Sequence, residues 1–498
     1  MGIVIRQSIK GTIINYVGAI IGFLTTMFIL TKYLTEEEIG LTRVILEAAT
    51  LLAGFAQLGT SASAFRFFPY FKDKEKQNNG FFFYLVTLPL IGCCIYFPLY
   101  FLLKKPISNY FITNSALFVD YYNWVVILAL FILYWTVFET YSNILMRIAI
   151  PKLIREVLVR LILIIVYLLY SFHFLDMDGF IAVFIGTYAI AIILNFIYLS
   201  KIEKISLKHD ISFIDKPLKK TFFNYTLFLI IGAIGGNLIS KIDLFMVSSQ
   251  MGLNYAGIYS VAFYMAIIVE IPTRSISSIS TPLVSQALKE GDTKQANQIY
   301  QNVSLHQLLA GSLIFLLIWI NIDNVFNIIP NGESYKQGKW VVFFIAVSKL
   351  IEITVSFGSY FLHYSRYYYW TLFFTFFITG LTIWMNILFI PIWGITGAAI
   401  ATVFTTIIVY GIQQWLVLVK VKGNFYTHRI IRVILNLLLL FGLNYLLPSL
   451  PNPWVDGIYR TLIIGLTAII TTYNLQISND VNQLINKIIF KIKELLCK

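Results

Sequence analysis

Long apolar segments recur along the whole chain of 498 residues, and they constrain its fold more than any other feature. A helix needs about 20 apolar residues to cross the hydrocarbon core of a bilayer. Because lipid satisfies no backbone hydrogen bonds, such segments span the membrane as helices. Only 12% of the residues are charged, against roughly 25% in soluble domains. The sequence therefore predicts an all-α integral membrane protein without a sizeable soluble domain.

We expect about fourteen transmembrane helices from the lengths of these segments. They are placed near residues 12–31, 41–62, 81–103, 121–142, 157–172, 179–199, 223–247, 256–279, 302–320, 340–361, 367–390, 394–419, 430–447 and 459–474. The first segment follows two positive charges and precedes no small-residue cleavage site, so it is interpreted as an uncleaved span and not as a signal peptide.

Lysine and arginine are concentrated in alternate connections, including residues 201–220 and 420–432. By the positive-inside rule this pattern predicts that both termini are cytoplasmic. The net charge of +13 is then explained by cytoplasmic loops beside anionic lipid, and no nucleic-acid partner is expected. Residues 481–496 alternate Ile and Leu with Lys at helical spacing, which predicts an amphipathic helix on the cytoplasmic leaflet.

Several charged residues lie within the apolar segments, where insertion of each costs about 2.5–3.5 kcal/mol. Pairs of opposite charge, four or three residues apart, share one helix face; they are Arg43 with Glu47, Glu156 with Arg160, Glu270 with Arg274, and Lys349 with Glu352. Lys241 and Asp243, two residues apart, project to different faces. The candidates for a substrate path are Arg43, Glu47, Arg66, Lys241, Asp243, Arg274, Lys349 and Glu352. The alternative is that each pair only neutralises itself, and that Arg66 only anchors the chain at the interface.

The chain contains a weak internal repeat. Gly40, within Leu34–Leu41, corresponds to Gly257, within Met251–Ile258, at an offset of 217 residues. Gly179 corresponds to Gly394 at an offset of 215. This predicts two six-helix bundles, residues 1–205 and 220–420, followed by two further helices and the amphipathic helix in residues 421–498. Parallel repeats around a central substrate site are a transporter architecture.

Five segments carry a family resemblance. They are KYLTEEEIGL (Lys32–Leu41), LGTSASAFRFFP (Leu58–Pro69), KIDLFMVSSQMGLNYAGIYSVA (Lys241–Ala262), TPLVSQALKEGD (Thr281–Asp292) and IPIWGITGAAIAT (Ile390–Thr402). In these segments the chain resembles the Wzx-like polysaccharide flippases, which share a superfamily with the MATE antiporters and the lipid II flippases. The resemblance implies two pseudo-two-fold related bundles that open alternately to the two faces of the membrane.

The resemblance also implies a cargo, an undecaprenyl-diphosphate-linked oligosaccharide moved from the cytoplasmic to the outer leaflet of a bacterial inner membrane. The product would serve the assembly of surface polysaccharide, such as lipopolysaccharide O-antigen, capsule or exopolysaccharide. A diphosphate requires fixed positive charge in its path, because Arg and Lys bind phosphate through charge-assisted hydrogen bonds. The expected partners are the lipid-linked oligosaccharide, membrane lipids and a polysaccharide polymerase, and the sequence allows a coupled H⁺ or Na⁺.

Two rival functions remain open at this stage. A cation-coupled MATE-type drug or metabolite antiporter would use Glu47, Asp243 or Glu352 to bind H⁺ or Na⁺. An enzyme acting on lipid-linked sugars is disfavoured, because the longest links expected outside the membrane, residues 104–120 and 321–339, are short and contain no histidine. The five histidines of the chain also lack metal-ligand spacing, and no phosphate-binding GK[ST] loop occurs. We therefore expect a transporter and not an enzyme, with no metal site and no resident cofactor.

Overall fold

The computed structural model describes residues 3–73, 77–203, 241–483 and 485–487, and every regular element in these ranges is a helix. The chain divides into two compact units, residues 1–260 and 261–498. The predicted bundle boundaries at residues 205 and 220 lie outside the described residues and stay a prediction.

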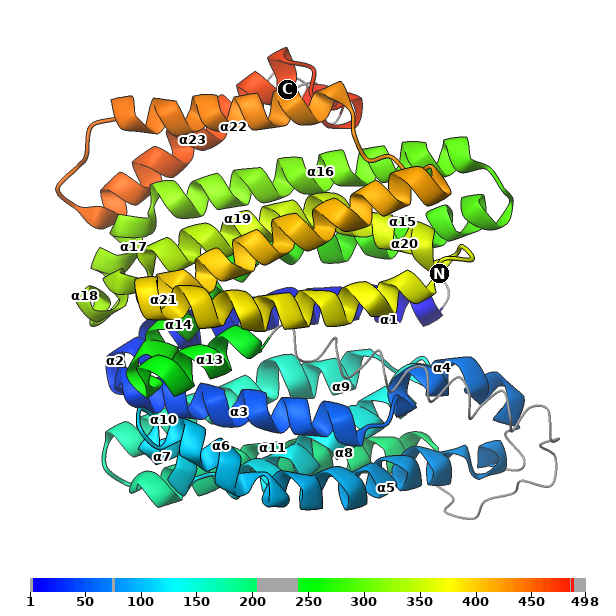
Figure 1. Ribbon diagram of the computed structural model, residues 1–498, viewed down its shortest axis with the longest axis vertical. Helices are drawn as coiled ribbons and strands as arrows, with labels where there is room; N and C mark the ends of the chain where they lie inside the picture. The colour runs from blue at the N-terminus through cyan, green and yellow to red at the C-terminus, as the bar shows by residue number, and fades with distance from the viewer. Residues whose placement is uncertain (1–2, 74–76, 204–240, 484, 488–498) are drawn as a thin grey trace, which may run out of the picture. The chain divides into compact units, whose positions relative to one another are not determined.

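Unit 1 contains long helices joined by short helical turns (Figure 1). In chain order they are α1 (Ile3–Leu24), η1 (Thr25–Leu30), α2 (Thr31–Tyr33), α3 (Glu36–Ala56), α4 (Thr60–Phe71), η2 (Gln77–Gly80), α5 (Phe81–Leu102), α6 (Lys104–Phe111), α7 (Ala116–Asp120), α8 (Trp124–Ile144), α9 (Ala149–Leu153), η3 (Ile154–Leu158), α10 (Val159–Ser171), α11 (Met177–Ile202), α13 (Ile242–Met251) and α14 (Leu253–Ala266), which crosses into unit 2. The segments η1 and η3 are π-helical, a form that often marks functional sites.

Local side-chain hydrogen bonds fix where these helices begin and end. Thr35 and Glu38 form a capping box at the start of α3, which satisfies two backbone N–H groups that the helix leaves unpaired. At the end of α13 the carbonyl oxygens of Ser249 and Gln250 accept hydrogen bonds from Asn114 Nδ2, at 2.9 and 3.0 Å. Side chains between α6 and α7 thereby supply partners for the last turn of α13.

The two glycines of the internal repeat contact each other's helices in unit 1. A Cβ atom at Gly40 would overlap the carbonyl oxygen of Leu253, four residues before Gly257, and a Cβ atom at Gly257 would overlap that of Glu36, four residues before Gly40. The contact is therefore reciprocal. Glycine permits this approach because small residues let two helix backbones come close together.

Aromatic side chains form the core at one end of unit 1. Phe68 and Phe71 of α4 pack on Phe81 of α5, with ring centres 5.3 and 4.9 Å apart. Tyr141 of α8 contacts Phe82 edge-on, and Leu199 of α11 completes the cluster. These contacts hold the ends of four helices together.

Unit 2 contains a helical segment, α21 (Tyr369–Val421), that is much longer than a membrane span and is broken at one residue. Its elements are η4 (Ile267–Glu270), α15 (Ile271–Lys289), α16 (Thr293–Ile320), α17 (Ile322–Ile328), α18 (Gly332–Tyr335), η5 (Lys336–Gly338), α19 (Lys339–Val355), η6 (Ser356–Gly358), α20 (Ser359–His363), α21 (Tyr369–Val421), α22 (His428–Leu446) and α23 (Pro453–Asn474). Helix α21 holds 53 residues and is interrupted at Gly394, where φ is +58° and ψ is −138°. Only glycine adopts this conformation readily, so Gly394 separates two predicted spans.

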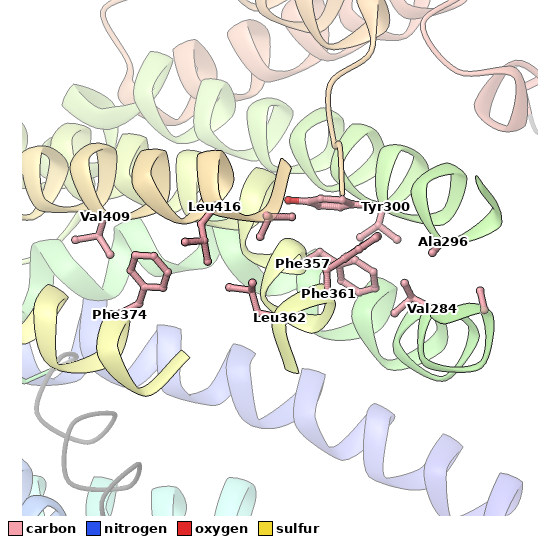
Figure 2. Close-up of a cluster of buried hydrophobic side chains, with 12 residues drawn as sticks. Val284, Ala296, Tyr300, Phe357, Phe361, Leu362, Phe374, Val409 and Leu416 are labelled. Atoms are coloured by element: carbon pink, nitrogen blue, oxygen red, sulfur yellow. The ribbon is translucent and has the colours of Figure 1, made fainter. Parts of the chain in front are cut away.

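Tyr300 of α16 organises the core of unit 2 (Figure 2). Its ring lies among Phe357 of η6, Phe361 of α20 and other apolar side chains, and it is fully buried. Its hydroxyl donates to the carbonyl oxygen of Val355, and Gln414 Oε1 lies at the same distance of 2.8 Å. Because a buried hydroxyl without a partner is costly, these bonds fix Tyr300 between α19 and α21.

A buried ion pair closes the connection between α22 and α23. Arg460 Nε lies 2.7 Å from Asp456 Oδ2, and the two side chains are 10% and 5% exposed. Asn324 and the backbone of Leu450 also donate to Asp456, while Asn444 accepts from Arg460. In the sequence, the spacing of four residues between Asp456 and Arg460 is a signal for this pair.

The all-α membrane fold is confirmed, and eleven helical segments of the described part are long and apolar enough to cross a membrane. The predicted spans 367–390 and 394–419 run together in α21, and 157–172 falls on the 13-residue α10. Most of the predicted span 223–247 and much of the predicted amphipathic helix lie outside the described residues. The total of fourteen therefore stays a prediction.

We expect Gly257→Ala to destabilise the protein by about 1–3 kcal/mol, the usual cost of overpacking a tight contact. The added methyl group would meet the backbone of α3 at Glu36. Gly186→Ala on α11 is the matched control, because no atom lies within 4 Å of its added Cβ and alanine favours helices. Thermal unfolding in detergent measures both variants. Equal unfolding temperatures for Gly257→Ala and Gly186→Ala would contradict the tight contact.

Candidate functional site

Lys241 and Glu47 form an ion pair inside unit 1. Lys241 directly precedes α13, Glu47 lies on α3, and the lysine amine donates to the glutamate carboxylate. The two side chains are 14% and 29% exposed. The sequence analysis paired Glu47 with Arg43, and this is corrected, because a residue 194 positions along the chain takes the carboxylate instead.

Arg43 and Asp243 find other partners in the same unit. Arg43 Nη2 donates to Thr26 Oγ1 in the π-helical segment η1, at 3.4 Å. Asp243 is buried on α13, and its Oδ2 accepts from the hydroxyl of Tyr259 on α14 at 3.2 Å. As predicted, Lys241 and Asp243 turn to different partners. Four of the candidate residues thus lie on α3 and at the start of α13.

A second charged network surrounds the π-helical segment η3. Arg160 Nη2 lies 2.8 Å from Glu156 Oε2, which confirms the predicted pair, and Arg160 also donates to the carbonyl of Gly18 on α1. Arg155 Nη1 lies 3.2 Å from Glu139 Oε2 on α8. Neither Glu139 nor Arg155 is among the site residues that the sequence predicted. The acidic Glu139 within a predicted span was the available signal.

Unit 2 contains a triad of one lysine and two glutamates. Lys349 Nζ on α19 lies 2.9 Å from Glu352 Oε2 and 3.1 Å from Glu270 Oε2 at the end of η4. The predicted Lys349 pair with Glu352 is confirmed, and Glu270 joins it. The side chains are 21% to 35% exposed, so the three groups are only partly removed from solvent. If all three are ionised, the triad carries one net negative charge.

A polar cavity of about 330 Å³ adjoins this triad. Glu270 and Glu352 line it together with hydroxyl groups of α15, η6 and α20, supplied by Thr273, Ser277, Ser356, Ser359 and Tyr360. The Thr273 hydroxyl is buried and has no hydrogen-bond partner in the described structure. Carboxylates and hydroxyls accept hydrogen bonds, so this cavity suits a cation or the hydroxyl groups of a sugar.

The remaining candidates lie apart from these groups or outside the description. Arg66 is exposed on α4, with its guanidinium 5.7 Å from the ring centre of Phe67. Arg274 belongs to α15, but its side chain lies outside the described part of the structure. Within the described ranges, no three His, Cys, Asp or Glu side chains are placed to hold a metal ion.

Comparison with known proteins assigns the family. The model of the family described as polysaccharide biosynthesis protein matches residues 4–288, more than half of the chain. The chain belongs to this family.

Two curated proteins are similar to this polysaccharide biosynthesis family member over part of their length. One is the probable low-salt glycan biosynthesis flippase Agl15 of Haloferax volcanii, 23% identical over 155 residues that cover 30% of this chain and 33% of Agl15. The other is the uncharacterized membrane protein MJ1068 of Methanocaldococcus jannaschii, 25% identical over 255 residues, 49% of this chain and 48% of that protein. The chain thus spans a third to a half of these relatives.

Solved structures share the fold over most of the chain. The lipid II flippase MurJ in an inward closed conformation has a TM-score of 0.71 and 16% identity, and the match covers 94% of this chain and 100% of MurJ. An inward-facing multidrug resistance MATE family transporter of the MOP superfamily has a TM-score of 0.60 and 13% identity, covering 80% and 94%. The fold of this family member is therefore the fold that MurJ and the MATE transporter share.

We expect Lys241→Gln and Glu47→Gln each to lower the stability of the protein by about 1–3 kcal/mol, because each leaves one poorly solvated charge without its partner. The double variant should lose less than the sum, since neither charge remains. Thermal unfolding in detergent gives the three values.

The control for this cycle is Lys336→Gln, which breaks the exposed pair with Glu333. Exposed pairs contribute about 0–1 kcal/mol, so little change is expected there. Strictly additive effects of the Lys241 and Glu47 substitutions would contradict the ion pair.

Proposed function

We propose that this protein is a flippase that moves an undecaprenyl-diphosphate-linked oligosaccharide from the cytoplasmic to the outer leaflet for surface polysaccharide assembly. The observation that carries the proposal is the match of residues 4–288 to the polysaccharide biosynthesis family. The similarity to Agl15, named a probable low-salt glycan biosynthesis flippase, and the fold shared with a lipid II flippase support it. Alternating access of two related bundles is the proposed mechanism.

The cargo consists of a diphosphate, a polar glycan and an apolar polyprenyl chain, and each part makes a different demand. We assign the diphosphate to the cations within the spans, Lys241, Arg43, Arg274 and Lys349. Lys241 and Lys349 already contact carboxylates in the structure. A phosphate would therefore have to replace Glu47 as the partner of Lys241, or Glu270 and Glu352 as the partners of Lys349. Such an exchange keeps each cation paired in both states, which limits the cost of charge at membrane depth.

The polar cavity of unit 2 supports a role in coupling or glycan recognition within the same proposal. Glu270 and Glu352 line it, and Lys349 neutralises only one of their charges. A proton or Na⁺ bound there would neutralise the excess negative charge, so that Lys349 would have one ionised carboxylate as its partner instead of two. Asp243, hydrogen-bonded to Tyr259, is a second candidate for proton binding in unit 1.

The same acidic cavity favours a second function, a cation-coupled exporter of the MATE type. Two carboxylates beside several hydroxyl groups suit a cationic drug or metabolite as well as an ion. The family match disfavours this function, since the matching family is described by polysaccharide biosynthesis.

The proposed location is the inner membrane of a bacterial cell, with both termini in the cytoplasm. The orientation rests on the lysine and arginine content of alternate loops. The proposed partners are the lipid-linked oligosaccharide, membrane lipids and a polymerase that receives the flipped product.

The flippase and the exporter are distinguished by reconstitution into vesicles. A labelled undecaprenyl-diphosphate oligosaccharide and a cationic dye are followed in the same proteoliposomes, with imposed H⁺ or Na⁺ gradients. We expect the lipid-linked oligosaccharide to change leaflet and the dye to stay. Dye movement driven by a gradient, without movement of the lipid, would replace the flippase with the exporter.

Removal of the proposed diphosphate contacts should slow flipping. We expect Lys241→Ala and Arg274→Ala each to lower the flipping rate per folded protein by about tenfold or more, because a charge-assisted hydrogen bond contributes about 1.5–3 kcal/mol. Lys336→Ala, which changes an exposed lysine, should leave the rate unchanged. Normal rates in both span variants would remove these cations from the cargo path.

Loss of the acidic cavity should change the dependence on ion gradients. We expect the double variant Glu270→Gln with Glu352→Gln to flip at a rate that no longer responds to an imposed H⁺ or Na⁺ gradient, because neutral amides bind no proton or Na⁺ in place of the carboxylates. The test compares the rates with and without each gradient. A gradient response equal to that of the unaltered protein would exclude a coupling role for these glutamates.

A further inference from the structure

A second and larger cavity lies in unit 1, away from the charged groups of α3 and α13. It has a volume of about 1180 Å³ and is lined by the end of α4, Asn78 of η2, the turn between α8 and α9, and the end of α11. Phe68 and Ile144 belong both to this lining and to the aromatic core of α4, α5 and α8. The residues that we assign to the cargo path do not line this cavity.

Three cations line the cavity, and they come from three different segments. Lys72 follows α4, Arg147 lies in the turn after α8, and Lys152 belongs to α9. Among the described residues, none of the three has a carboxylate within ion-pair distance. Glu203 is the single acid among the described residues of the lining, and it accepts a hydrogen bond from Asn78. These described residues together carry a net positive charge of two.

The turn after α8 brings Arg147 to the cavity by an unusual backbone conformation. Met146 has a φ of +58°, the left-handed region that glycine usually occupies at a helix end. The N–H of Arg147 donates to Ser142 and that of Met146 to Asn143, at 2.9 and 3.0 Å. These two bonds end α8 in a Schellman motif. Arg147 is thereby held by a defined turn and not by a loose loop.

The rest of the lining combines apolar side chains with an unsatisfied amide. The apolar part of the wall is formed by Phe68, Pro69, Ile148 and Ile202. Asn143 is one of the polar residues of the wall. The buried Oδ1 atom of Asn143 has no hydrogen-bond partner in the described structure. A buried polar atom without a partner is unfavourable, so a ligand that supplies a hydrogen bond there is stabilised.

We propose that this cavity binds an anionic amphiphile, with its phosphate group held by Lys72, Arg147 and Lys152. The amphiphile would come from the leaflet on whose side these three cations lie. Converging cations suit a phosphate, because charge-assisted hydrogen bonds to phosphate oxygens are among the strong ones. The apolar wall suits the hydrocarbon chain that such a lipid carries. Cations that only anchor a helix at the interface require neither a shared cavity nor an apolar wall.

The phosphate has three sources, which binding experiments separate. The full-length protein in neutral detergent is titrated with farnesyl diphosphate, with phosphatidylglycerol and with inorganic pyrophosphate, and native mass spectrometry measures each affinity. The cavity variant carries Lys72→Gln, Arg147→Gln and Lys152→Gln. The matched control carries Lys10→Gln, Lys201→Gln and Lys420→Gln, three exposed cations that do not line the cavity.

We expect the cavity variant to bind farnesyl diphosphate or phosphatidylglycerol at least about tenfold more weakly than the control variant does. The lipid that loses affinity identifies the source. A third result is that pyrophosphate binds as tightly as farnesyl diphosphate and loses its affinity in the cavity variant. That result would show that the same cations bind a free phosphate compound. Equal affinities of the cavity and control variants for all three probes would overturn the proposal.

Glu203→Gln tests the site through an expected gain in affinity, and a misfolded variant would not show such a gain. Loss of the one acid in the lining should tighten phosphate binding several-fold, because like charge near an anion site is unfavourable. Weaker or unchanged binding in this variant would contradict the electrostatic basis of the site. The binding measurement requires no transport, so its failure leaves the flippase proposal standing, and a failure to flip lipid leaves this site standing.

Discussion

Charge within membrane-spanning helices is the constraint on which the rest of this structure depends. An unpaired charge at membrane depth costs about 2.5–3.5 kcal/mol, and the described helices associate so that this cost is reduced. Lys241, at the start of α13, forms an ion pair with Glu47 of α3, and Lys349 forms ion pairs with two glutamates. Paired charges of this kind give modest stability, and they leave polar groups within the spans, on the path that we propose for a lipid-linked anion. The same contacts therefore serve the fold and the proposed transport.

Close backbone approach is the second determinant, and it accounts for the internal repeat in physical terms. Gly40 and Gly257 occupy equivalent positions in the repeat, and each packs against the backbone four residues before the other. The contact is reciprocal, because each glycine faces a backbone carbonyl group of the other helix. Neither position tolerates a side chain. Gly394 has a different role, because its positive φ separates two spans within α21.

Hydropathy and spacing were sufficient to predict most of the fold and part of the site. A long apolar segment in lipid can adopt few structures other than a helix. Charged residues three or four positions apart meet on one face of that helix, as Lys349 and Glu352 do. Long-range partners were beyond this reasoning. Glu47 was assigned to Arg43 because no rule of spacing links it to Lys241, 194 residues away. The cavity lined by Lys72, Arg147 and Lys152 depends on the left-handed backbone conformation of Met146. No glycine or asparagine stands at this position, so the sequence does not predict the turn.

The leaflet distribution of the lipid-linked oligosaccharide in host cells tests the central claim most directly. Cells with and without the gene are treated with a membrane-impermeant glycosidase, and the fraction of lipid-linked glycan that is cleaved is measured. The flippase account predicts that the glycan becomes inaccessible when the protein is absent, and that surface polysaccharide is lost with it. An unchanged cleaved fraction together with normal surface polysaccharide would contradict the account.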